Sequence, residues 1–188
     1  MKVGFVGLGN VGSKLAGSLL RNGYEVMVRD LNAAFVADFL ALGASAADSP
    51  KQLAQACDII ITCLPSPAAC SAVMEGTSTE EGVIAGLSDG KIWLEMSTTD
   101  ESEIRRIGAL VKAAGAEPVD CPVSGGCHRA DTGNISIFAG CSRAAFERAL
   151  PVLTTLGRRV LHTGELGTAS KLKVVTNYLA TAHLVALS

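Results

Sequence analysis

Apolar residues along this chain fall into short runs, separated by longer stretches in which they recur every three or four positions. Short bounded runs are typical of strands, and the longer spacing is typical of helices. The expected strands are residues 2–6, 24–30, 58–64, 91–96, 116–120, 134–140 and 157–164. The expected helices are residues 11–23, 49–57, 99–115 and 143–157, the last with a possible kink or restart at Pro151. This alternation predicts an α/β protein whose mostly parallel sheet is covered by helices on both faces.

The last helical pattern runs from about Gly167 to Ser188 and lacks a C-terminal cap. It is apolar on more than one side, with Leu172, Val175 and Leu179 among the exposed candidates. A helix of this kind needs another surface to pack against. We therefore expect either that the chain continues past this helix or that the helix pairs with another copy.

Composition narrows the class of protein. Of the residues, 48% are apolar and 18% are charged, and the net charge of -2 gives no general attraction to nucleic acid or to an anionic membrane. No run approaches the roughly 20 apolar residues that span a bilayer. The six cysteines show neither CxxC spacing nor a His/Cys cluster, so we expect reduced thiols, no metal site and a cytoplasmic location.

The stretch GFVGLGNVG follows the first strand and opens the first helix. Gly7, Gly9 and Gly12 have the spacing that allows a tight turn, a close backbone approach to a pyrophosphate and close packing of helix on strand. The phosphate would lie at the positive N-terminus of the helix. With Asp30 at the end of the next strand, the pattern predicts a dinucleotide-binding site.

Asp30 bears on which dinucleotide is bound. Its carboxylate can accept hydrogen bonds from both ribose hydroxyls and would repel a 2′-phosphate, which favours NAD over NADP. Arg29 complicates this reading, because an arginine can neutralise such a phosphate. Strand alternation predicts that Arg29 points away from the cofactor.

Two more loops follow predicted strands, at the sheet edge where ligands bind in doubly wound sheets. In CLPSP, Leu64 and Pro65 can wall the cofactor or simply stiffen the loop. In MSTTD, the hydroxyls of Ser97, Thr98 and Thr99 can bind a ligand, but we expect one of them to cap the following helix. Position at the sheet edge favours a cofactor-side role for CLPSP, whereas local sequence leaves both alternatives open for MSTTD.

The stretch CPVSGGCHRADTG follows another strand. Ser124, Gly125 and Gly126 offer a hydroxyl and unshielded backbone N–H groups, which suit a carboxylate, whereas the alternative is a flexible turn. His128 is a lone histidine in a loop and stays outside the expected catalytic set.

Lys171 and Lys173 lie about 200° apart around a helix, so only one of them can face a given cleft. Lys173 shares its face with Thr176 and Asn177, and Lys171 shares its face with Val175. Spacing alone does not make either lysine functional, since most helical lysines are solvated.

Taken together, GLGNVG, Asp30, CLPSP, the MST stretch, PVSGG and GTASKLKVVTN resemble, in order, the β-hydroxyacid dehydrogenases. That family includes 3-hydroxyisobutyrate dehydrogenase, tartronate semialdehyde reductase and, more distantly, 6-phosphogluconate dehydrogenase. The resemblance covers essentially the whole chain. It implies a Rossmann-type doubly wound sheet, NAD as the cofactor, and interconversion of a small anionic β-hydroxy acid and its semialdehyde.

The resemblance also implies roles for single residues. It places Lys173 as the general acid and base, Asn177 beside it to orient the substrate, and Lys171 in solvent. The segment Ser124, Gly125 and Gly126 would take the substrate carboxylate. The remaining positions would contact the cofactor: Gly7, Leu8, Gly9, Asn10, Val11, Gly12, Asp30, Leu64, Pro65 and Thr98.

By the same resemblance, residues 1–163 form the dinucleotide-binding domain, and residues 164–188 begin an interdomain helix that leads to an all-helical, dimer-forming domain. Two departures stand out: Thr176 replaces an asparagine common in relatives, and His128-Arg129 offers charge for a second anionic group on the substrate. An NAD-binding scaffold or sensor without turnover is the alternative function, and imine reduction is a further one. Relatives of both kinds generally lack the lysine found here at 173.

Overall fold

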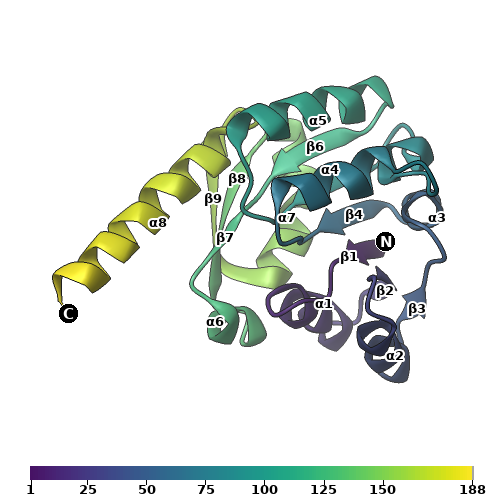
Figure 1. The fold of residues 1–188 in the computed structure, drawn as a ribbon, viewed down its shortest axis with the longest axis horizontal. Helices are drawn as coiled ribbons and strands as arrows, with labels where there is room; N and C mark the ends of the chain where they lie inside the picture. The colour runs from purple at the N-terminus through teal and green to yellow at the C-terminus, as the bar shows by residue number, and fades with distance from the viewer. Residues whose placement is uncertain (188) are drawn as a thin grey trace.

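The computed structural model describes residues 1–187 and places one sheet between two layers of helices (Figure 1). Its strands are β1 (Lys2–Val6), β2 (Glu25–Arg29), β3 (Ser45–Ala46), β4 (Ile59–Thr62), β5 (Ile92–Glu95), β6 (Glu117–Asp120), β7 (Val123–Ser124), β8 (Ile135–Gly140) and β9 (Gly157–Gly164). Its helices are α1 (Gly12–Arg21), α2 (Ala33–Ala41), α3 (Pro50–Ala56), α4 (Pro67–Glu75), the 3-10 helix η1 (Val83–Gly86), α5 (Glu101–Ala113), α6 (Cys127–Asp131), α7 (Arg143–Leu156) and α8 (Thr168–Ala186). All the expected strands and helices are present. The elements β3, β7, α2, α4, η1 and α6 were not anticipated.

The strand order is β3-β2-β1-β4-β5-β6-β8-β7, with β9 paired to β8. The first six strands of this order are parallel. Strand β8 runs antiparallel to β6 and β7, and β9 runs parallel to β8. The predicted doubly wound, mostly parallel sheet is therefore confirmed, with an antiparallel part at one side. In the parallel part, the carboxyl ends of β1, β2, β4 and β5 lie at one edge.

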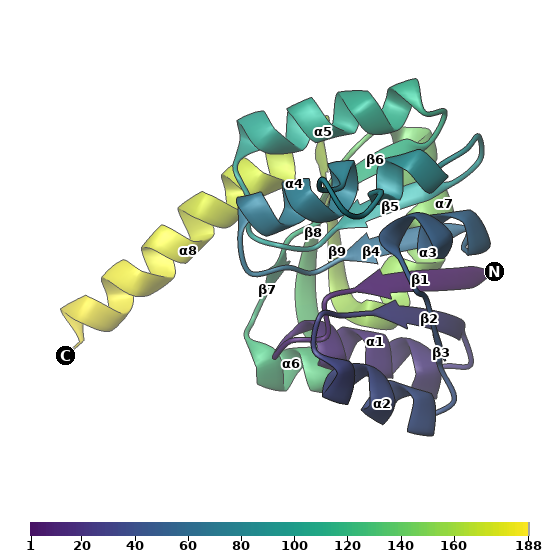
Figure 2. The same ribbon diagram turned by 45° about the vertical axis from the view of Figure 1, so that its right-hand side comes forward.

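Side chains alternate between two cores because successive strand residues point to opposite faces. Phe5, Ile61 and Leu94 pack with α1, α2 and α7, whereas Val6, Ile60 and Trp93 pack with α3, α4 and α5. Figure 2 shows α1 and α2 on one side of the sheet and α3, α4 and α5 on the other. All residues of β4 and β5, and all but the first of β1, are buried, so these strands are covered on both faces.

Helix starts follow local capping chemistry. The Ser49 hydroxyl accepts a hydrogen bond from the Gln52 backbone N–H, and Pro50 occupies the first turn. The same pair of residue types, Ser66 and Pro67, begins α4. Helix α7 runs through Pro151 as one element, so no restart occurs there.

Helix α8 begins against the sheet and then extends away from the body of the molecule (Figure 1). Its first turn is buried at Ala169 and Ser170, but Tyr178 and Leu184 are each 72% exposed. The expected apolar helix without a packing partner is thus present within residues 1–187. No helix in this range is both long enough and apolar enough to cross a membrane.

Candidate active site

A cavity of about 740 Å³ lies along the carboxyl ends of β1, β2, β4 and β5. The loop after β1, the loops after β4 and β5, and one residue of α8 are among the segments that border it. Predicted site residues that border it are Gly7, Gly9, Asn10, Val11, Gly12, Asp30, Leu64, Pro65, Thr98, Gly126 and Lys173. Segments far apart in the sequence therefore meet at the sheet edge that was predicted to bind the ligand.

The glycine loop has the backbone geometry that its sequence predicts. Gly7 has a φ of +96°, a left-handed conformation that favours glycine. A Cβ on Gly12 would lie 1.9 Å from the Gly7 carbonyl oxygen, so the turn and α1 pack too closely for any side chain. A Cβ on Gly9 would meet no protein atom within 4 Å. Of the three glycines in this loop, Gly9 alone leaves open space for a ligand within the described residues.

The N-terminus of α1 suits a phosphate. Its N-cap residue, Val11, makes no side-chain capping hydrogen bond, and the first turn has no acidic residue. The backbone N–H groups of this turn therefore lack a side-chain acceptor, and the helix dipole favours an anion there. Together with the open space at Gly9, these features fit the pyrophosphate of a dinucleotide.

Asp30 holds the glycine loop as well as bordering the cavity. One carboxylate oxygen accepts a hydrogen bond from the Leu8 N–H at 2.6 Å, and the other accepts one from the Asn32 N–H at 2.8 Å. Leu8 contributes through its backbone, because its side chain is only 1% exposed and does not border the cavity. Asp30 therefore links the end of β2 to the glycine turn.

The prediction that Arg29 points away from the cofactor is wrong. Arg29 and Asp30 both border the cavity, although Arg29 is still paired within β2, because the cavity at the strand ends is bordered from both faces of the sheet, by α2 on one side and α4 on the other. The Arg29 guanidinium forms an ion pair with Glu80 at 2.5 Å, and Glu80 borders the cavity too. The charge of Arg29 is therefore already paired with that of Glu80, while the buried Arg29 Nε has no hydrogen-bond partner within the described residues.

The loops after β4 and β5 are joined beneath the cavity. The Ser97 hydroxyl accepts a hydrogen bond from the Leu64 N–H at 2.8 Å, and a Glu95 oxygen accepts one from the Ser97 N–H at 2.7 Å. Fully buried Glu95 also accepts hydrogen bonds from Thr62 at 2.8 Å and Cys70 at 2.6 Å. Burial raises the pKa of the Glu95 carboxyl, and these donors oppose that shift. Glu95 thus fixes both loops that carry Leu64 and Thr98.

The capping role expected of the MSTTD hydroxyls is not observed. Helix α5 begins after Asp100, which makes no side-chain capping bond. Ser97 binds the Leu64 loop instead, Thr98 is exposed at the cavity, and the buried Thr99 hydroxyl has no partner within the described residues. The ligand-side alternative therefore fits Thr98 better than capping does.

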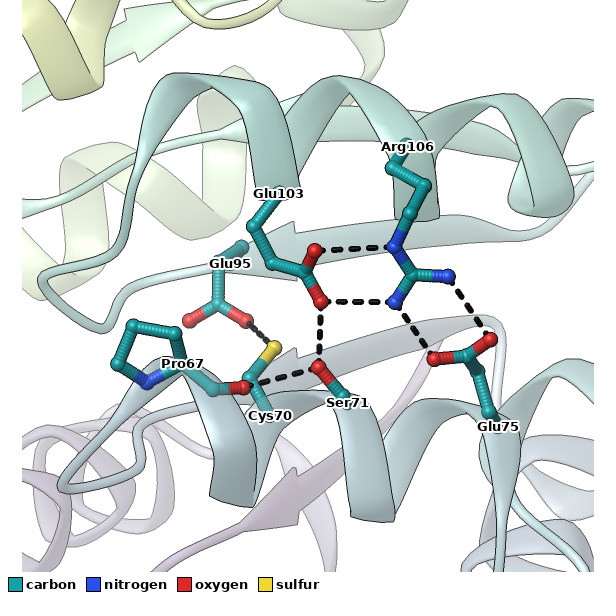
Figure 3. A network of polar contacts seen from close by, with 7 residues as sticks. All are labelled: Pro67, Cys70, Ser71, Glu75, Glu95, Glu103 and Arg106. Carbon is teal, nitrogen blue, oxygen red and sulfur yellow. Dashed lines mark hydrogen bonds and ion pairs between the residues drawn. The ribbon is translucent and has the colours of Figure 1, made fainter.

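A second polar network joins α4 to α5 (Figure 3). The Ser71 hydroxyl donates to Glu103, and the Arg106 guanidinium contacts Glu103 and Glu75 at 2.7 and 2.6 Å. Its hydrogen bonds with Arg106 and Ser71 lower the pKa of Glu103 to about 2. Helix α4 directly follows the loop that carries Leu64, so this network attaches that loop, through α4, to α5.

The two lysines of α8 have separate environments, as the helical geometry predicts. Lys173 borders the cavity, and burial lowers its pKa below the usual 10.5. Lys171 is 60% exposed and pairs with Glu101 at 2.9 Å. Asn177, one turn after Lys173, is exposed and does not border the cavity. The structure thus brings Lys173, but not Asn177, to the cavity formed by the glycine loop.

The segment expected to bind a carboxylate is split. Val123 and Gly126 border the cavity, but Ser124 and Gly125 do not, because strand alternation turns Ser124 to the other face of β7. Gly125 and Gly126 have φ values of +134° and +79°, which glycine adopts readily. His128 and Arg129 border a separate cavity.

Other cavity residues had no sequence signal. Phe35, Thr77 and Glu80 border the site from α2 and from the loop after α4, two regions that lack a recognisable ligand motif. The capping pair Ser66-Pro67 was a usable signal for α4, since Ser49-Pro50 had the same pattern. Only the tertiary fold brings Glu80 to Arg29.

Comparison with known proteins gives the family. Residues 2–164 match the family described as the NAD binding domain of 6-phosphogluconate dehydrogenase. The 2-(hydroxymethyl)glutarate dehydrogenase of Eubacterium barkeri is 35% identical over 188 residues, which are 100% of this chain and 62% of that protein. The 3-sulfolactaldehyde reductase of Escherichia coli is 34% identical over 180 residues, 96% of this chain and 59% of that protein.

Solved structures agree with this assignment. The crystal structure of 3-hydroxyisobutyrate dehydrogenase from Salmonella typhimurium has a TM-score of 0.90 and 32% identity, covering 99% of this chain and 64% of that one. The chain therefore spans less than two thirds of the length of these relatives. From the family match, this chain belongs to the family described as the NAD binding domain of 6-phosphogluconate dehydrogenase, and it is similar to the dehydrogenases and the reductase named above.

Proposed function

We propose that the protein transfers a hydride between NAD and a small β-hydroxy acid of the 3-hydroxyisobutyrate type, with Lys173 as general acid and base. The observation that carries this proposal is the position of Lys173. It borders the same cavity as Gly9 and Asp30, and burial lowers its pKa. The named activities of the relatives, all dehydrogenases or reductases of small hydroxy acids or aldehydes, support the reaction class.

The chemistry requires one proton to move. When NAD is bound, it supplies the hydride acceptor for oxidation of the hydroxyl carbon. The neutral Lys173 amine accepts the hydroxyl proton as hydride leaves, and the ammonium returns that proton in the reverse reaction. A lowered pKa increases the fraction of neutral amine near neutral pH, which favours the base role.

On the substrate side, we propose that the segment from Ser124 to Gly126 takes the carboxylate and that Asn177 orients the reacting end. Gly126 borders the Lys173 cavity, which supports its part. Asn177 lies one helical turn beyond Lys173 and is exposed, so it can reach a substrate held between α8 and a surface that covers it. Thr98 borders the same cavity and is proposed to lie near the nicotinamide.

For the cofactor, we propose a preference for NAD over NADP. The Asp30 carboxylate would repel a 2′-phosphate, and Glu80 already neutralises Arg29, the nearest cation. The two acids together with one arginine leave this end of the cavity with a net negative charge, which opposes a phosphate group.

The assembly and location of the protein are also proposals. The exposed apolar side chains of α8, including Tyr178 and Leu184, favour a helical domain or a second copy as the partner, with α8 as the connecting helix. Ser188, the last residue of the expected connecting segment, lies outside the described residues. The six cysteines are free thiols, which agrees with a reducing, cytoplasmic location. Neither nucleic acid nor a membrane is expected as a partner.

Turnover tests the proposal. NAD reduction is assayed with 3-hydroxyisobutyrate, glycerate, 4-hydroxybutyrate and dicarboxylic or sulfonated hydroxy acids, using this sequence with any residues that follow Ser188. We expect Lys173→Ala to abolish turnover of the preferred acid without weakening NAD binding, and Lys171→Ala to retain turnover. Equal losses in both variants would refute the catalytic role. Tight NAD binding without turnover of any acid would favour the scaffold or sensor function.

A further inference from the structure

A second cavity, of about 510 Å³, lies where α6 meets β8 and the start of β9, apart from the cofactor cavity. It shares no bordering residue with that cavity. Within residues 1–187 no carboxylate borders it, although the whole chain has more acidic than basic residues. The residues around it are His128, Arg129, Thr132, Asn134, Ser136, Arg158 and Arg159.

The three arginines of this cavity differ from the other arginines of the chain. Within residues 1–187, the side chains of Arg129, Arg158 and Arg159 make no ion pair or hydrogen bond. The remaining six arginines each bind an acidic side chain or a backbone carbonyl. These are Arg21, Arg29, Arg105, Arg106, Arg143 and Arg148. These three guanidiniums are therefore unmatched within the described residues, and all three arginines border one cavity.

The nearest acid is directed elsewhere. Asp131, the last residue of α6, lies 3.9 Å from both Lys14 and Arg21 on α1, and its backbone carbonyl accepts a hydrogen bond from Arg21. The stem of Arg129 packs over Gly125, where a Cβ would lie 2.9 Å from the arginine Cδ. Gly125 thus leaves room for Arg129 to lie along the loop that precedes α6.

Neutral donors complete the cavity. The Asn134 side-chain amide donates to the Thr132 hydroxyl at 3.3 Å, which fixes the turn between α6 and β8. Ser136 pairs with Arg159 across β8 and β9, so their side chains stand on the same face of the sheet. A planar guanidinium binds two oxygens of a carboxylate, phosphate or sulfonate at once, and a hydroxyl can add a third contact.

From the three unmatched arginines around one acid-free cavity, we propose that this cavity binds a small polyanion built of carboxylate, phosphate or sulfonate groups. Three like charges side by side repel one another, and a ligand with two or more negative charges removes that repulsion. A monoanion can match only one of the three guanidiniums. The cavity should therefore discriminate by ligand charge rather than by ligand shape.

Such a ligand can be either one end of the substrate or a separate molecule. Ser124 pairs with Ser136 across β7 and β8, so Ser124, Ser136 and Arg159 lie in a row on one face of the sheet. An anionic group at the far end of a substrate held at Ser124 can therefore reach the cavity. The other source is a separate small polyanion that binds without substrate or cofactor.

Calorimetric titration of the 188-residue chain with citrate, inorganic phosphate and acetate, at matched ionic strength, tests the proposal. We expect citrate to bind at least about tenfold more tightly than acetate. We expect Arg129→Gln and Arg159→Gln each to weaken citrate binding by about tenfold or more, and Arg143→Gln, which loses its pair with Glu147 and its contact with the Phe146 ring, to leave it unchanged. All variants should retain the wild-type unfolding temperature and NADH affinity, since none of these arginines borders the cofactor cavity.

Equal affinity for citrate and acetate, or equal citrate affinity in Arg159→Gln and Arg143→Gln, would overturn the proposal. The source of the ligand is identified by repeating the titrations with a dicarboxylic hydroxy acid in the presence and absence of NADH. Arginine-dependent binding that tightens with NADH assigns the cavity to one end of the substrate. Arginine-dependent binding that ignores NADH assigns it to a separate ligand.

Discussion

Replacing Asp120 tests how the fold positions Lys173 at the cavity. Asp120 ends β6, is fully buried and binds the first turn of α8. Its carboxylate accepts hydrogen bonds from the Ser170 N–H at 2.8 Å and the Ser170 hydroxyl at 2.7 Å. Burial raises the pKa of Asp120, while these donors and the backbone N–H groups of Gly167 and Ala169 lower it. The carboxylate thus serves as an acceptor for a helix start whose own N-cap, Gly167, provides no side chain.

The magnitude follows from the two Ser170 contacts. In Asp120→Ala, both donors lose their acceptor, and a buried unsatisfied donor costs about 1–3 kcal/mol. We therefore expect Asp120→Ala to lower the free energy of unfolding by about 2–6 kcal/mol. The matched control Ser170→Ala removes the hydroxyl but leaves the carboxylate bound to backbone donors, so we expect it to cost only about 1 kcal/mol.

Urea unfolding, followed by the fluorescence of the single buried Trp93, measures the global effect. Hydrogen exchange at residues 168–173 measures whether the first turn of α8 opens. Asp120→Ala should raise exchange there more than Ser170→Ala does. If the two variants lose equal stability, or if exchange in this turn stays unchanged in Asp120→Ala, then Asp120 does not anchor the helix that carries Lys173.

Four more predictions concern the site and its support. Glu80→Gln should shift the ratio of the NADH and NADPH dissociation constants toward NADPH by roughly tenfold, because it frees Arg29 for a 2′-phosphate. The control is Glu81→Gln, which removes only the pair between Glu81 and Lys51. An unchanged ratio in Glu80→Gln would contradict the role given to Arg29. Gly12→Ala should lower both the unfolding temperature and the NADH affinity, since the new Cβ would meet the Gly7 carbonyl. An unfolding temperature equal to that of the wild type would contradict this close packing. For hydroxy-acid oxidation, kcat/KM should rise with pH through a pKa below the usual lysine value, because the neutral Lys173 amine is the base; a profile that rises only near 10.5 would exclude it. The pKa of Glu103 is about 2 in the folded protein and ordinarily 4.5, so its contribution to the free energy of unfolding is complete above pH 4.5 and is lost as pH falls toward 2. The urea midpoint of Glu103→Gln should therefore fall less between pH 4.5 and 2 than that of the wild type. Equal acid sensitivity of the two proteins would argue against the Arg106 contact.

The parts of the site that local sequence encodes were predicted well. The glycine spacing requires a tight turn at one place in the chain, and Gly7 and Gly12 have the conformation and packing that the spacing implies. The separation of Lys171 from Lys173 follows from helix geometry alone. Both depend on residues that are close in sequence.

Contacts between distant segments could not be predicted in this way. Arg29 and Glu80 are joined only when the loop after α4 folds over β2, and no motif marks Glu80. Strand alternation holds at Arg29, but it does not exclude this residue from the cavity, because the cavity is bordered from both faces of the sheet. Glu95 was read as part of an apolar strand, yet it binds Ser97 and thereby the Leu64 loop.

The missed elements have similar causes. Helix α2, with the sequence AAFVADFLA, is apolar on nearly all sides and so shows little helical period. Strand β7 has only two residues, and its face depends on pairing with β8. That pairing turns Ser124 from the cofactor cavity toward Ser136, which local sequence does not reveal.

Binding of NADH to the 188-residue chain tests the central claim, that the cavity at the glycine loop holds the dinucleotide. Titrations compare the wild type with Gly9→Ala, whose new Cβ would meet no protein atom within 4 Å, and with the control Gly17→Ala in α1. We predict that wild type and Gly17→Ala bind NADH alike, whereas Gly9→Ala unfolds at the wild-type temperature but binds about tenfold or more weakly. NADH binding of equal strength in Gly9→Ala and wild type, or no binding by the wild type, would contradict the account.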